Sequence, residues 1–386
     1  MKTLTSFNFT DKKVLLRTGL DVPLAGREEV ADDFRVKKAA PTIKYLVEKG
    51  AKIIIVSHLG RPQRSDPRLS LRIVLPILEK EVGKKISFVS DFLRTDTKKI
   101  IDQMKSGDIL LLENIRFFKE ETENNQEFAK KLASLADVFV LDDFSSCHRN
   151  SASVVGVSQY LESFAGLLLE KEVKVLNRVL TQPWRPLVLI IGGAKVETKS
   201  EVLKDMLSIA DQILLGGKIA NLILQAKFLN ISLSNFEDSK IRSDFDFELT
   251  SPKLHLPLDL MVSPDKSGEL YRRISAPGSV RRSELIFDIG PETIEIFAQI
   301  IKEAKMIIWS GPLGFFENPY FERGTREIAE RIARNHTAFK LAGGGDTILA
   351  LKKFHVRDRF DFISTGGSAM LYFLAGKELP GLKAVS

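Results

Sequence analysis

The sequence predicts an α/β protein made of two Rossmann-like parallel-sheet lobes that are joined by a long connecting helix. Nine short apolar runs, each the length of a strand, alternate with helical patterns, and this alternation is typical of βαβ units and parallel sheets. Nine strands suit two sheets better than one, and 386 residues are enough for two domains. A stretch of helical periodicity at 158–184 separates the first runs from the later ones and stops at Pro183.

The nine expected strands form two series, and each strand is followed by a polar or glycine-rich break. Helical patterns lie between the strands, for example at 35–50 and 323–335. The first series contains 13–18, 51–60, 108–114 and 137–143, and the second contains 186–194, 211–217, 305–311, 338–345 and 361–367. We therefore expect an N-terminal lobe at 1–157, a connecting helix at 158–182 and a C-terminal lobe that begins at residue 183.

The composition is that of an ordinary globular protein with an excess of basic residues. The formal net charge of +7 favours anionic partners such as phosphorylated metabolites and nucleotides. The single cysteine, Cys147, fits a reducing compartment. The first residues contain no apolar h-region, and no uninterrupted apolar run of about 18 residues occurs in the chain. We expect a soluble, cytoplasmic protein that does not bind membranes.

Glycine follows the strands of the second series, at the sheet edge where parallel α/β proteins bind their ligands. Glycine lets backbone N–H groups approach a ligand closely, and a helix start adds the positive end of its dipole. The loops read GGAK (192–195), GGK (216–218), SGPLG (310–314), GGGD (343–346) and TGG (365–367). A tight turn with Asp346 as N-cap is the alternative for one loop, but five loops in succession favour a phosphate cradle. Asp346 would repel a phosphate unless a cation stood between them, so we assign it to Mg²⁺, and Thr347 can donate to the same phosphates.

Basic residues follow the strands of the first series. Arginine forks suit phosphate and carboxylate groups. One such arginine alone reads as a surface ion pair, but several at strand ends predict a pocket for a small polyanion. The residues are Arg17, His58, Arg61, Arg116, His148 and Arg149, together with Arg35 after the segment VADDF. An anion site in one lobe and a magnesium–nucleotide site in the other predict a phosphoryl-transfer enzyme with a closing cleft.

The chain resembles the phosphoglycerate kinase family over essentially its whole length. The blocks that carry the resemblance occur in the family's order and read SHLGRP, LLENIRF, HR at 148–149, GGAKVETK, DIGPET, SGPLGFFE, GGGDT and STGGSAMLYFLAGKELPGL. The resemblance implies a monomeric glycolytic enzyme that moves a phosphoryl group reversibly between 1,3-bisphosphoglycerate and ADP, giving 3-phosphoglycerate and ATP, with Mg²⁺. It also implies a nucleotide-binding lobe at 183–365 and a tail, 366–386, that packs back on the phosphoglycerate-binding lobe.

The resemblance also assigns roles to individual residues. Arg35, Lys195, Lys199 and Gly345 correspond to catalytic positions, and Asp346 to the magnesium ligand. The positions that correspond to phosphoglycerate contacts are Gly19, Leu20, Asp21, Arg35, His58, Leu59, Gly60, Arg61, Arg116 and Arg149. The positions that correspond to nucleotide contacts are Gly193, Ala194, Lys195, Lys199, Gly216, Gly217, Gly290, Pro312, Glu317, Gly344, Gly345, Asp346 and Thr347.

Two blocks on the phosphoglycerate side depart from the family's pattern. The family's first-strand motif is Arg-Val-Asp-Phe-Asn-Val-Pro, whereas this chain reads RTGLDVP, so Gly19 replaces the aspartate and Asp21 replaces an asparagine. The block NDAFGTAHRAHAS has become LDDFSSCHRNSAS at 141–153. An ionised Asp21 beside an anion is unfavourable unless Arg35 or Arg149 pairs with it. We therefore expect normal binding of the magnesium nucleotide and weaker binding of 3-phosphoglycerate.

The predicted chemistry needs no catalytic base, because the nucleophile in the kinase direction is a carboxylate with a pKa near ~4. Catalysis then requires alignment and neutralisation of negative charge, so His58 is interpreted as an anion partner rather than an acid–base residue. His148 is open to the same role or to a structural one. The alternatives are a non-catalytic or altered-substrate nucleotide-binding relative, and a nucleic-acid binder. The second is disfavoured because the basic residues are not interleaved with aromatic platforms, so we expect no nucleic-acid partner.

Overall fold

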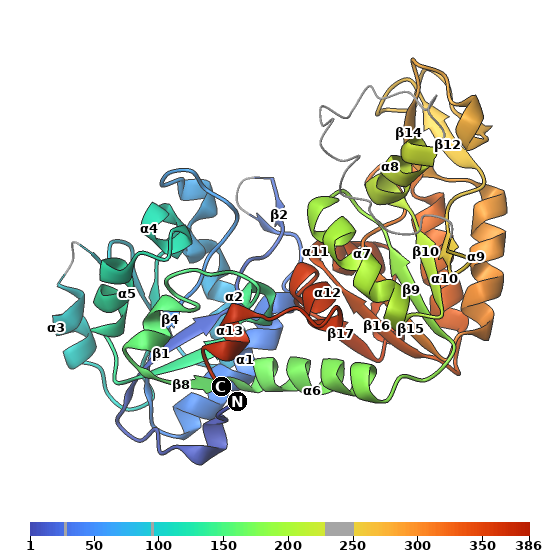
Figure 1. Ribbon diagram of the computed structural model, residues 1–386. Helices are drawn as coiled ribbons and strands as arrows, with labels where there is room; N and C mark the ends of the chain where they lie inside the picture. The colour runs from blue at the N-terminus through green and yellow to red at the C-terminus, as the bar shows by residue number, and fades with distance from the viewer. Residues whose placement is uncertain (27–28, 94–95, 228–250) are drawn as a thin grey trace. The chain divides into compact units, whose positions relative to one another are not determined.

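The chain folds into two compact units, which are described in turn (Figure 1). The computed structural model describes residues 1–26, 29–93, 96–227 and 251–386. Unit 1 contains Met1–Leu176 together with Glu378–Ser386, and unit 2 contains Asn177–Lys377. Each unit holds a parallel sheet with helices packed against it, so the predicted α/β class is confirmed.

Unit 1 is organised around a sheet of six parallel strands in the order β5-β6-β4-β1-β7-β8. The strands are β1 (Lys13–Thr18), β4 (Lys52–Val56), β5 (Ser87–Val89), β6 (Ile109–Leu112), β7 (Val138–Asp142) and β8 (Glu162–Ala165). All four strands predicted in this half are present, and they form the middle of the sheet. The sequence did not predict β5 and β8, because SFV and ESFA are too short or too polar to stand out as apolar runs.

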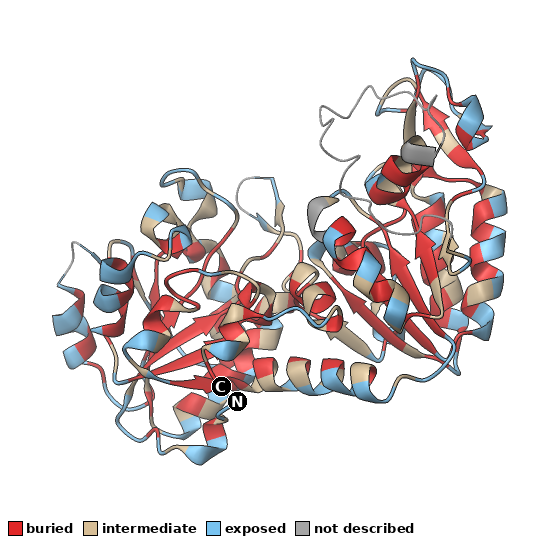
Figure 2. Cartoon of the chain, viewed as in Figure 1, coloured by how far each residue is buried: buried red, intermediate tan, exposed pale blue. Residues whose placement is uncertain are grey.

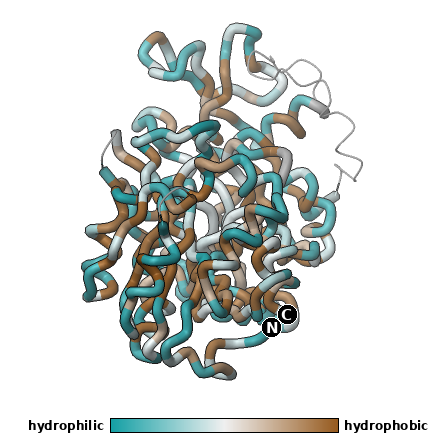
Figure 3. Tube along the Cα trace, turned by 90° about the vertical axis from the view of Figure 1, so that its left-hand side faces the viewer, coloured by the Kyte–Doolittle hydropathy of each residue, from teal (hydrophilic) through white to brown (hydrophobic). Residues whose placement is uncertain are grey.

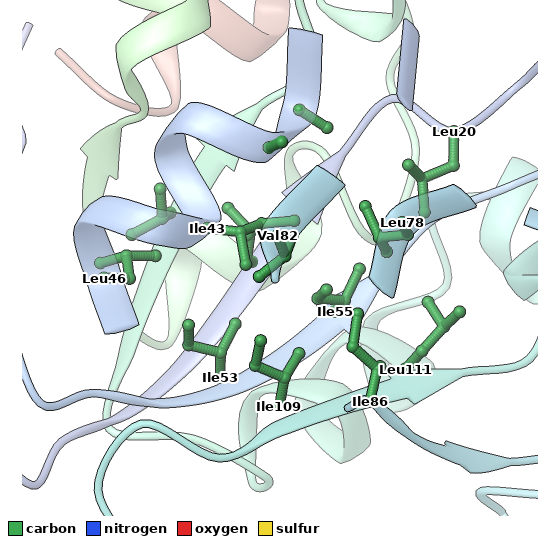
Figure 4. Packing of buried hydrophobic residues seen from close by; sticks show 14 of the residues in the cluster. Leu20, Ile43, Leu46, Ile53, Ile55, Leu78, Val82, Ile86, Ile109 and Leu111 are labelled. Atoms are coloured by element: carbon green, nitrogen blue, oxygen red, sulfur yellow. The ribbon is translucent and has the colours of Figure 1, made fainter. Parts of the chain in front are cut away.

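The helices of unit 1 bury one apolar face each against the sheet. Ile43 and Leu46 of α1 and Leu78 of α2 pack in one cluster with Ile53 and Ile55 of β4 (Figure 4). A two-stranded hairpin, β2 (Leu24–Ala25) with β3 (Glu29–Val30), precedes α1. The helices are α1 (Phe34–Glu48), α2 (Leu75–Val82), α3 (Thr97–Asp102), α4 (Lys119–Thr122), α5 (Gln126–Ala133) and, from the chain's end, α13 (Pro380–Lys383).

Helix α6 (Leu167–Thr181) carries the chain from unit 1 into unit 2. It begins later than the predicted start at residue 158, because part of that stretch forms strand β8, which pairs with β7. The carboxylate of Asp142 marks the beginning of the helix. Its Oδ1 accepts the backbone N–H groups of Leu168 at 2.9 Å and Leu169 at 3.0 Å, which satisfies two amide donors that a helix start leaves without an intrahelical partner.

Unit 2 contains a second sheet of six parallel strands in the order β11-β10-β9-β15-β16-β17. The strands are β9 (Leu187–Ile191), β10 (Gln212–Leu215), β11 (Leu254–His255), β15 (Met306–Ser310), β16 (Phe339–Gly343) and β17 (Phe362–Ser364). All five predicted strands are present, and most of their residues are buried between the helices (Figure 2). The helices are α7 (Glu197–Ile209), α8 (Gly217–Lys227), α9 (Pro291–Glu303), α10 (Arg323–Arg334), α11 (Gly345–Lys353) and α12 (Ser368–Leu374).

Unit 2 also contains a small antiparallel sheet that the sequence did not predict. Strand β12 (Leu260–Ser263) lies between β13 (Arg273–Ser275) and β14 (Leu285–Ile289). These strands are short, and their longest apolar runs, at 260–262 and 285–287, contain only three residues each. The pattern therefore gave no clear strand signal.

The end of the chain is divided between the two units. The predicted tail began at residue 366, whereas only Glu378–Ser386 belongs to unit 1, and α12 belongs to unit 2. Close backbone packing explains why α12 stays in unit 2. A Cβ on Gly367, which precedes α12, would lie 2.7 Å from the Cα of Gly344 after β16.

The two termini lie side by side in unit 1 (Figures 1 and 3). The backbone N–H of Lys2 donates to the carbonyl of Val385 at 3.0 Å, and the N–H of Gly381 donates to the carbonyl of Cys147 at 2.9 Å. The last residues of the chain are thus part of the structure that carries the strand-end loops of unit 1. Among the helices in the described ranges, none has the length and apolar character needed to cross a membrane.

Candidate functional site

The residues that follow β1, β4, β6 and β7 meet at one edge of the unit 1 sheet. These strands are parallel and in register, with Arg17 opposite Val56 and Thr18 opposite Asp142. The carboxyl ends of parallel strands lie at the same edge, so the loops after them are neighbours. The structure places at this edge the predicted anion-binding residues Gly19, Leu20, Asp21, His58, Leu59, Gly60, Arg61, Arg116 and Arg149.

A cavity of about 600 Å³ opens among these loops. Its basic lining residues are Arg17, Arg61, Arg116, Lys119, His148 and Arg149. The one acid among the lining residues, Glu121, is buried and accepts hydrogen bonds from Ser151 and Ser153. The cavity therefore presents positive charge to whatever enters it.

The guanidinium groups around the cavity repel one another. Burial, together with the charges of Arg17 and Arg149, lowers the pKa of Arg116 to about 10. Burial and the charge of Arg61 lower the pKa of Arg149. Arg116 Nη1 donates to the backbone carbonyl of Gly60 at 2.7 Å, and no carboxylate of the described residues pairs with it. An anion between these side chains would relieve the repulsion, as expected of a polyanion site.

Asp21 lies in this basic environment, and Arg35 of α1 pairs with it. Arg35 Nη1 lies 3.3 Å from Asp21 Oδ2 and donates to the Asp21 carbonyl at 2.7 Å. The backbone N–H of Gly60 donates to Asp21 Oδ1 at 2.8 Å. Burial raises the pKa of Asp21, but His58, the charge of Arg35 and the Gly60 N–H together hold that pKa well below its usual range. Asp21 is therefore an ionised carboxylate whose charge is offset by the predicted partner Arg35.

His58 is a neutral side chain at pH 7 rather than a cation. Burial lowers its pKa to about 4; Asp21 raises it, and the charges of Arg17 and Arg116 lower it further. The guanidinium of Arg17 has only donors, so its Nη2 donates to His58 Nδ1 at 2.7 Å and leaves the ring proton on Nε2. That nitrogen faces Asp21 Oδ2 at 3.6 Å. Any anion contact of His58 is therefore an N–H contact and not an ion pair.

Arg17 and Asp143 form a buried ion pair beside the cavity. Arg17 Nη1 lies 2.9 Å from Asp143 Oδ2, and both side chains are almost fully buried. Burial raises the pKa of Asp143, but the charge of Arg17, the nearby ring of His58 and the hydroxyls of Ser145 and Ser146 hold that pKa well below its usual range. The sequence placed Arg17 among the basic strand-end residues of the predicted polyanion pocket, but it did not reveal the carboxylate that pairs with it. It gave no role to Asp143, whose only signal was the change in the block at 141–153.

In unit 2 the glycine loops after β9, β10 and β15 interlock. The N–H of Gly217 donates to the carbonyl of Leu313 at 2.9 Å, and the N–H of Lys218 donates to that of Gly193 at 3.1 Å. A Cβ on Gly217 would lie 2.5 Å from the nitrogen of Gly193. Glycine is required for this approach of one backbone to another, and Gly193, Gly216, Gly217 and Pro312 are thereby brought together.

A second group of predicted residues lies where β16 leads into α11. Gly344 has φ +103°, a conformation that side chains rarely adopt, and it precedes the first turn of the helix. Gly345 and Asp346 in that turn are exposed, and a Cβ on Gly345 would meet nothing within 4 Å. The start of this helix is therefore exposed, as a phosphate site requires.

Lys199 near the start of α7 is the most buried lysine of the candidate site. Its Nζ donates to the carbonyl of Gly192, and a Cβ on Gly193 would lie 3.1 Å from the same Nζ. Burial lowers the pKa of Lys199 to about 8; the charge of Asp346 raises it and that of Lys195 lowers it. Lys195 and Ala194 are exposed on the loop after β9. The ammonium group is thus held close to the glycine loops and is still mostly charged at pH 7.

Asp346 of unit 2 suits a magnesium ion that is bound partly by the phosphate groups of a ligand. The described residues contain no cluster of three or more His, Cys, Asp or Glu side chains able to hold a metal ion. Mg²⁺ commonly uses one or two carboxylates together with phosphate oxygens and water. Asp346 offers one exposed carboxylate next to the free amides of α11, which suits this coordination.

Three predicted nucleotide residues have other positions. The hydroxyl of Thr347 is buried, accepts the N–H of Gly311 at 2.7 Å and donates to the carbonyl of Gly343 at 3.0 Å. Its predicted donation to a phosphate would require that second bond to break. Gly290 lies between β14 and α9, where its N–H donates to the carbonyl of Asp259, and Glu317 is exposed on the loop after β15. The predicted nucleotide contacts of these two residues stay predictions.

Comparison with known proteins gives one consistent result. The family model described as phosphoglycerate kinase matches residues 4–377. The chain is similar to phosphoglycerate kinase of Dictyoglomus turgidum, with 43% identity over 96% of this chain and 94% of the relative. It is 40% identical to that of Aquifex aeolicus over 99% of this chain and 97% of the relative. Among solved structures, phosphoglycerate kinase from Pyrococcus horikoshii matches with a TM-score of 0.86 and 33% identity over 100% of this chain and 98% of that one. The Coxiella burnetii enzyme matches with a TM-score of 0.78 and 37% identity over 99% and 98%.

Proposed function

This chain belongs to the phosphoglycerate kinase family, and we propose that its two sets of strand-end loops divide the two substrates between them. The protein is a kinase that acts in glycolysis, and its family implies transfer between 1,3-bisphosphoglycerate with ADP and 3-phosphoglycerate with ATP. The relatives reported above are all named phosphoglycerate kinase, and none is named as a non-catalytic relative. The observation that carries the proposal is the arginine-lined cavity of unit 1, in which guanidinium groups repel one another.

We assign the phosphoglycerate to this cavity. Arg61, Arg116 and Arg149 supply charged donors for its phosphate and carboxylate groups. Arg35 is shared with Asp21, so part of its charge is already offset before substrate binds. This sharing supports the expectation that 3-phosphoglycerate binds more weakly than it would without an acid at position 21.

We assign the magnesium nucleotide to the glycine loops of unit 2. The amides at the start of α11 and the ammonium groups of Lys195 and Lys199 suit the phosphates. Asp346 would hold Mg²⁺, which when bound neutralises phosphate charge. The interlocked loops after β9 and β10 and Gly290 would shape the adenosine slot, and Glu317 would contact the ribose.

The proposed step forms one bond and breaks one bond. In the kinase direction, a carboxylate oxygen of 3-phosphoglycerate attacks the γ-phosphorus of ATP, and the bond to the β-phosphate oxygen breaks. The attacking group is already ionised, so no side chain has to remove a proton. The chain contributes by orienting the carboxylate through arginines and by placing Lys199 beside the oxygens of the transferring group.

Replacing Lys199 tests this assignment. We expect Lys199→Ala to lower kcat by about 100-fold or more, as loss of one charge-stabilising donor does in other active sites, with a smaller change in the KM for 3-phosphoglycerate. The matched control is Lys204→Ala, an exposed lysine of the same helix. A coupled assay in both directions gives the constants, and a kcat equal to that of the control would remove Lys199 from the mechanism.

Substrate choice tests the function itself. The rate of ATP-dependent phosphorylation is measured with 3-phosphoglycerate and with other phosphorylated carboxylic acids of similar size. We expect 3-phosphoglycerate to give the highest kcat/KM. A clear preference for another acid would show that the altered loop after β1 has changed the substrate.

We further propose that the protein is a cytoplasmic monomer. A role in glycolysis and a single, buried cysteine support this compartment. Light scattering at several concentrations checks the oligomeric state, and a mass twice that of the chain would replace the monomer with a dimer.

A further inference from the structure

We propose that Asp143 is a positioning residue of the phosphoglycerate site and that it can act only because residue 19 is glycine. In this proposal the carboxylate that the family's motif carries after β1 is supplied here from the end of β7. The inference rests on the proposed assignment of phosphoglycerate to the unit 1 cavity. It concerns how the arginine and the histidine of that cavity are held in place.

The two positions are neighbours across a strand pair. Thr18 and Asp142 are partners in register at the carboxyl ends of β1 and β7, and residues 19 and 143 follow them directly. A Cβ on Gly19 would lie 3.0 Å from Asp143 Oδ1 and 3.3 Å from its Cγ. Such a contact is tighter than nearly all those that a real Cβ makes, so any side chain at position 19 would press the Asp143 carboxylate out of its present position.

Asp143 is fully engaged in that space. Its Oδ2 lies 2.9 Å from Arg17 Nη1 and accepts the hydroxyl of Ser146 at 2.7 Å. Its Oδ1 accepts the hydroxyl of Ser145 at 2.6 Å. Only 1% of the residue is exposed, so the guanidinium of Arg17 would be left buried and without its charge partner if this carboxylate were removed.

The pair reaches the cavity through Arg17. Arg17 lines the cavity and donates to His58 Nδ1 at 2.7 Å, which fixes the ring so that Nε2 carries its proton. Asp143 therefore holds Arg17, and Arg17 holds His58. Because Asp143 also offsets the charge of Arg17, the net positive charge that remains for the substrate lies on Arg61, Arg116, Lys119 and Arg149.

The sequence shows both changes together. This chain has glycine where the family's first-strand motif has aspartate, and it has Asp143 where the family's block NDAF has alanine. With aspartate at both positions the site would contain two neighbouring carboxylates. With glycine at position 19 and alanine at position 143 it would contain neither. The contact between the two positions links the changes, since a Cβ at position 19 would lie 3.0 Å from Asp143 Oδ1.

The test is a reciprocal exchange in the full-length protein. The variants are Gly19→Asp, Asp143→Ala, the double variant with both changes, and Asp143→Asn, which keeps the volume and removes the charge. Calorimetric titration gives the Kd for 3-phosphoglycerate and for ATP without requiring turnover, and the coupled assay gives KM and kcat. Thermal unfolding of each variant reports stability separately.

We expect each single substitution to raise the Kd for 3-phosphoglycerate by about tenfold or more, and the double variant to return within about threefold of the parent, because coupled neighbours are not additive. The Kd for ATP should stay within about twofold throughout. Asp143→Asn should resemble Asp143→Ala in affinity but be closer to the parent in stability. The proposal would be overturned if the double variant lost as much affinity for 3-phosphoglycerate as the two single variants lose together. An unchanged affinity in Asp143→Asn would also overturn it. Failure of the parent to bind 3-phosphoglycerate would overturn the proposed function instead, and with it this inference.

Discussion

Asp21 shows how a single acid can be accommodated in a site that attracts anions. Its carboxylate accepts from Gly60, faces His58 and pairs with Arg35, and these contacts outweigh the cost of burial. The charge is therefore compensated inside the protein, but the compensation uses part of Arg35. A substrate anion in the same cavity still experiences the field of the Asp21 carboxylate.

Replacing Asp21 with asparagine should strengthen substrate binding. The amide oxygen of Asp21→Asn can still accept from Gly60, while the negative charge of residue 21 is removed from the surroundings of Arg35 and of the cavity. We expect the Kd for 3-phosphoglycerate to fall by about three- to tenfold, as expected for removal of one repulsive charge near the surface. The affinity should be measured by calorimetric titration at two salt concentrations, since the difference should shrink at the higher one.

A matched control for this substitution is Asp66→Asn. Asp66 pairs with Arg68 at 2.7 Å in an exposed loop, so its replacement removes an equal charge outside the cavity. Its effect on phosphoglycerate affinity should be small. Weaker binding in Asp21→Asn would mean that the carboxylate is needed to hold Arg35 in its binding position, which contradicts the repulsion argument.

At the scale of elements, strands with long apolar runs were predictable and short ones were not. KVLLRT, DILLLEN and DVFVLDD are apolar enough to indicate buried strands of a parallel sheet. Strand β8 is formed by ESFA, which gains its position by pairing with β7, and β11 has only two residues. Such strands depend on a neighbour that is distant in sequence, so local pattern could not reveal them.

The same distinction applies to the candidate site. The residues after β1, β4 and β7 were predictable because parallel strands bring their carboxyl ends to one edge. The partner of each charge was not predictable, because Asp143 and Arg17 are 126 positions apart and their pairing depends on the register of β1 with β7. The neutral state of His58 likewise follows from burial, which the sequence does not display.

Strand β14 and helix α10 meet at a buried carboxyl group, Asp288. Its Oδ2 accepts the N–H of Gly324 at 2.6 Å in the first turn of the helix. Burial raises the pKa of Asp288 to about 8; the N–H groups of Gly324 and Ile289 and the charge of Arg323 lower it, and Glu327 raises it. The folded state thus holds this proton more tightly than the unfolded chain, in which the pKa is about 4. Its contribution to stability is full below pH 4 and is lost as the pH rises from about 4 to about 8.

Asparagine at position 288 should remove this dependence on pH. Asp288→Asn keeps the shape and an acceptor for Gly324 but has no proton to lose. We expect its Tm to resemble that of the parent near pH 4 and to exceed it at pH 9 by several degrees or more, since a difference of about four pKa units corresponds to about 5 kcal/mol. Calorimetric scans across this range, with the exposed Asp358→Asn as control, give the comparison. Parallel curves for parent and variant would show that Asp288 is ionised in the folded protein at pH 7.

At the scale of the whole molecule, the chain leaves unit 1 within α6 and returns to it only near its end. Unit 1 is therefore complete only after Glu378–Ser386 has packed into it. The contact of Gly381 with Cys147 lies next to His148 and Arg149, which line the anion cavity. The end of the chain thus supports the loop that carries two cavity residues.

A side chain at position 381 should therefore weaken phosphoglycerate binding without affecting the nucleotide. A Cβ on Gly381 would lie 2.8 Å from the Cα of Cys147 and 2.9 Å from Val154 Cγ1, so Gly381→Val must displace the cavity loop or the tail. We expect a loss of about 1–3 kcal/mol in stability, as overpacking usually causes, and a several-fold higher Kd for 3-phosphoglycerate with an unchanged Kd for ATP. Gly278→Val is the control, since a Cβ there meets nothing within 4 Å. The contacts of Gly381 are with Cys147 and Val154, so we expect the substitution to affect only the loop that carries these residues. Equal losses of affinity for 3-phosphoglycerate and for ATP would contradict this expectation.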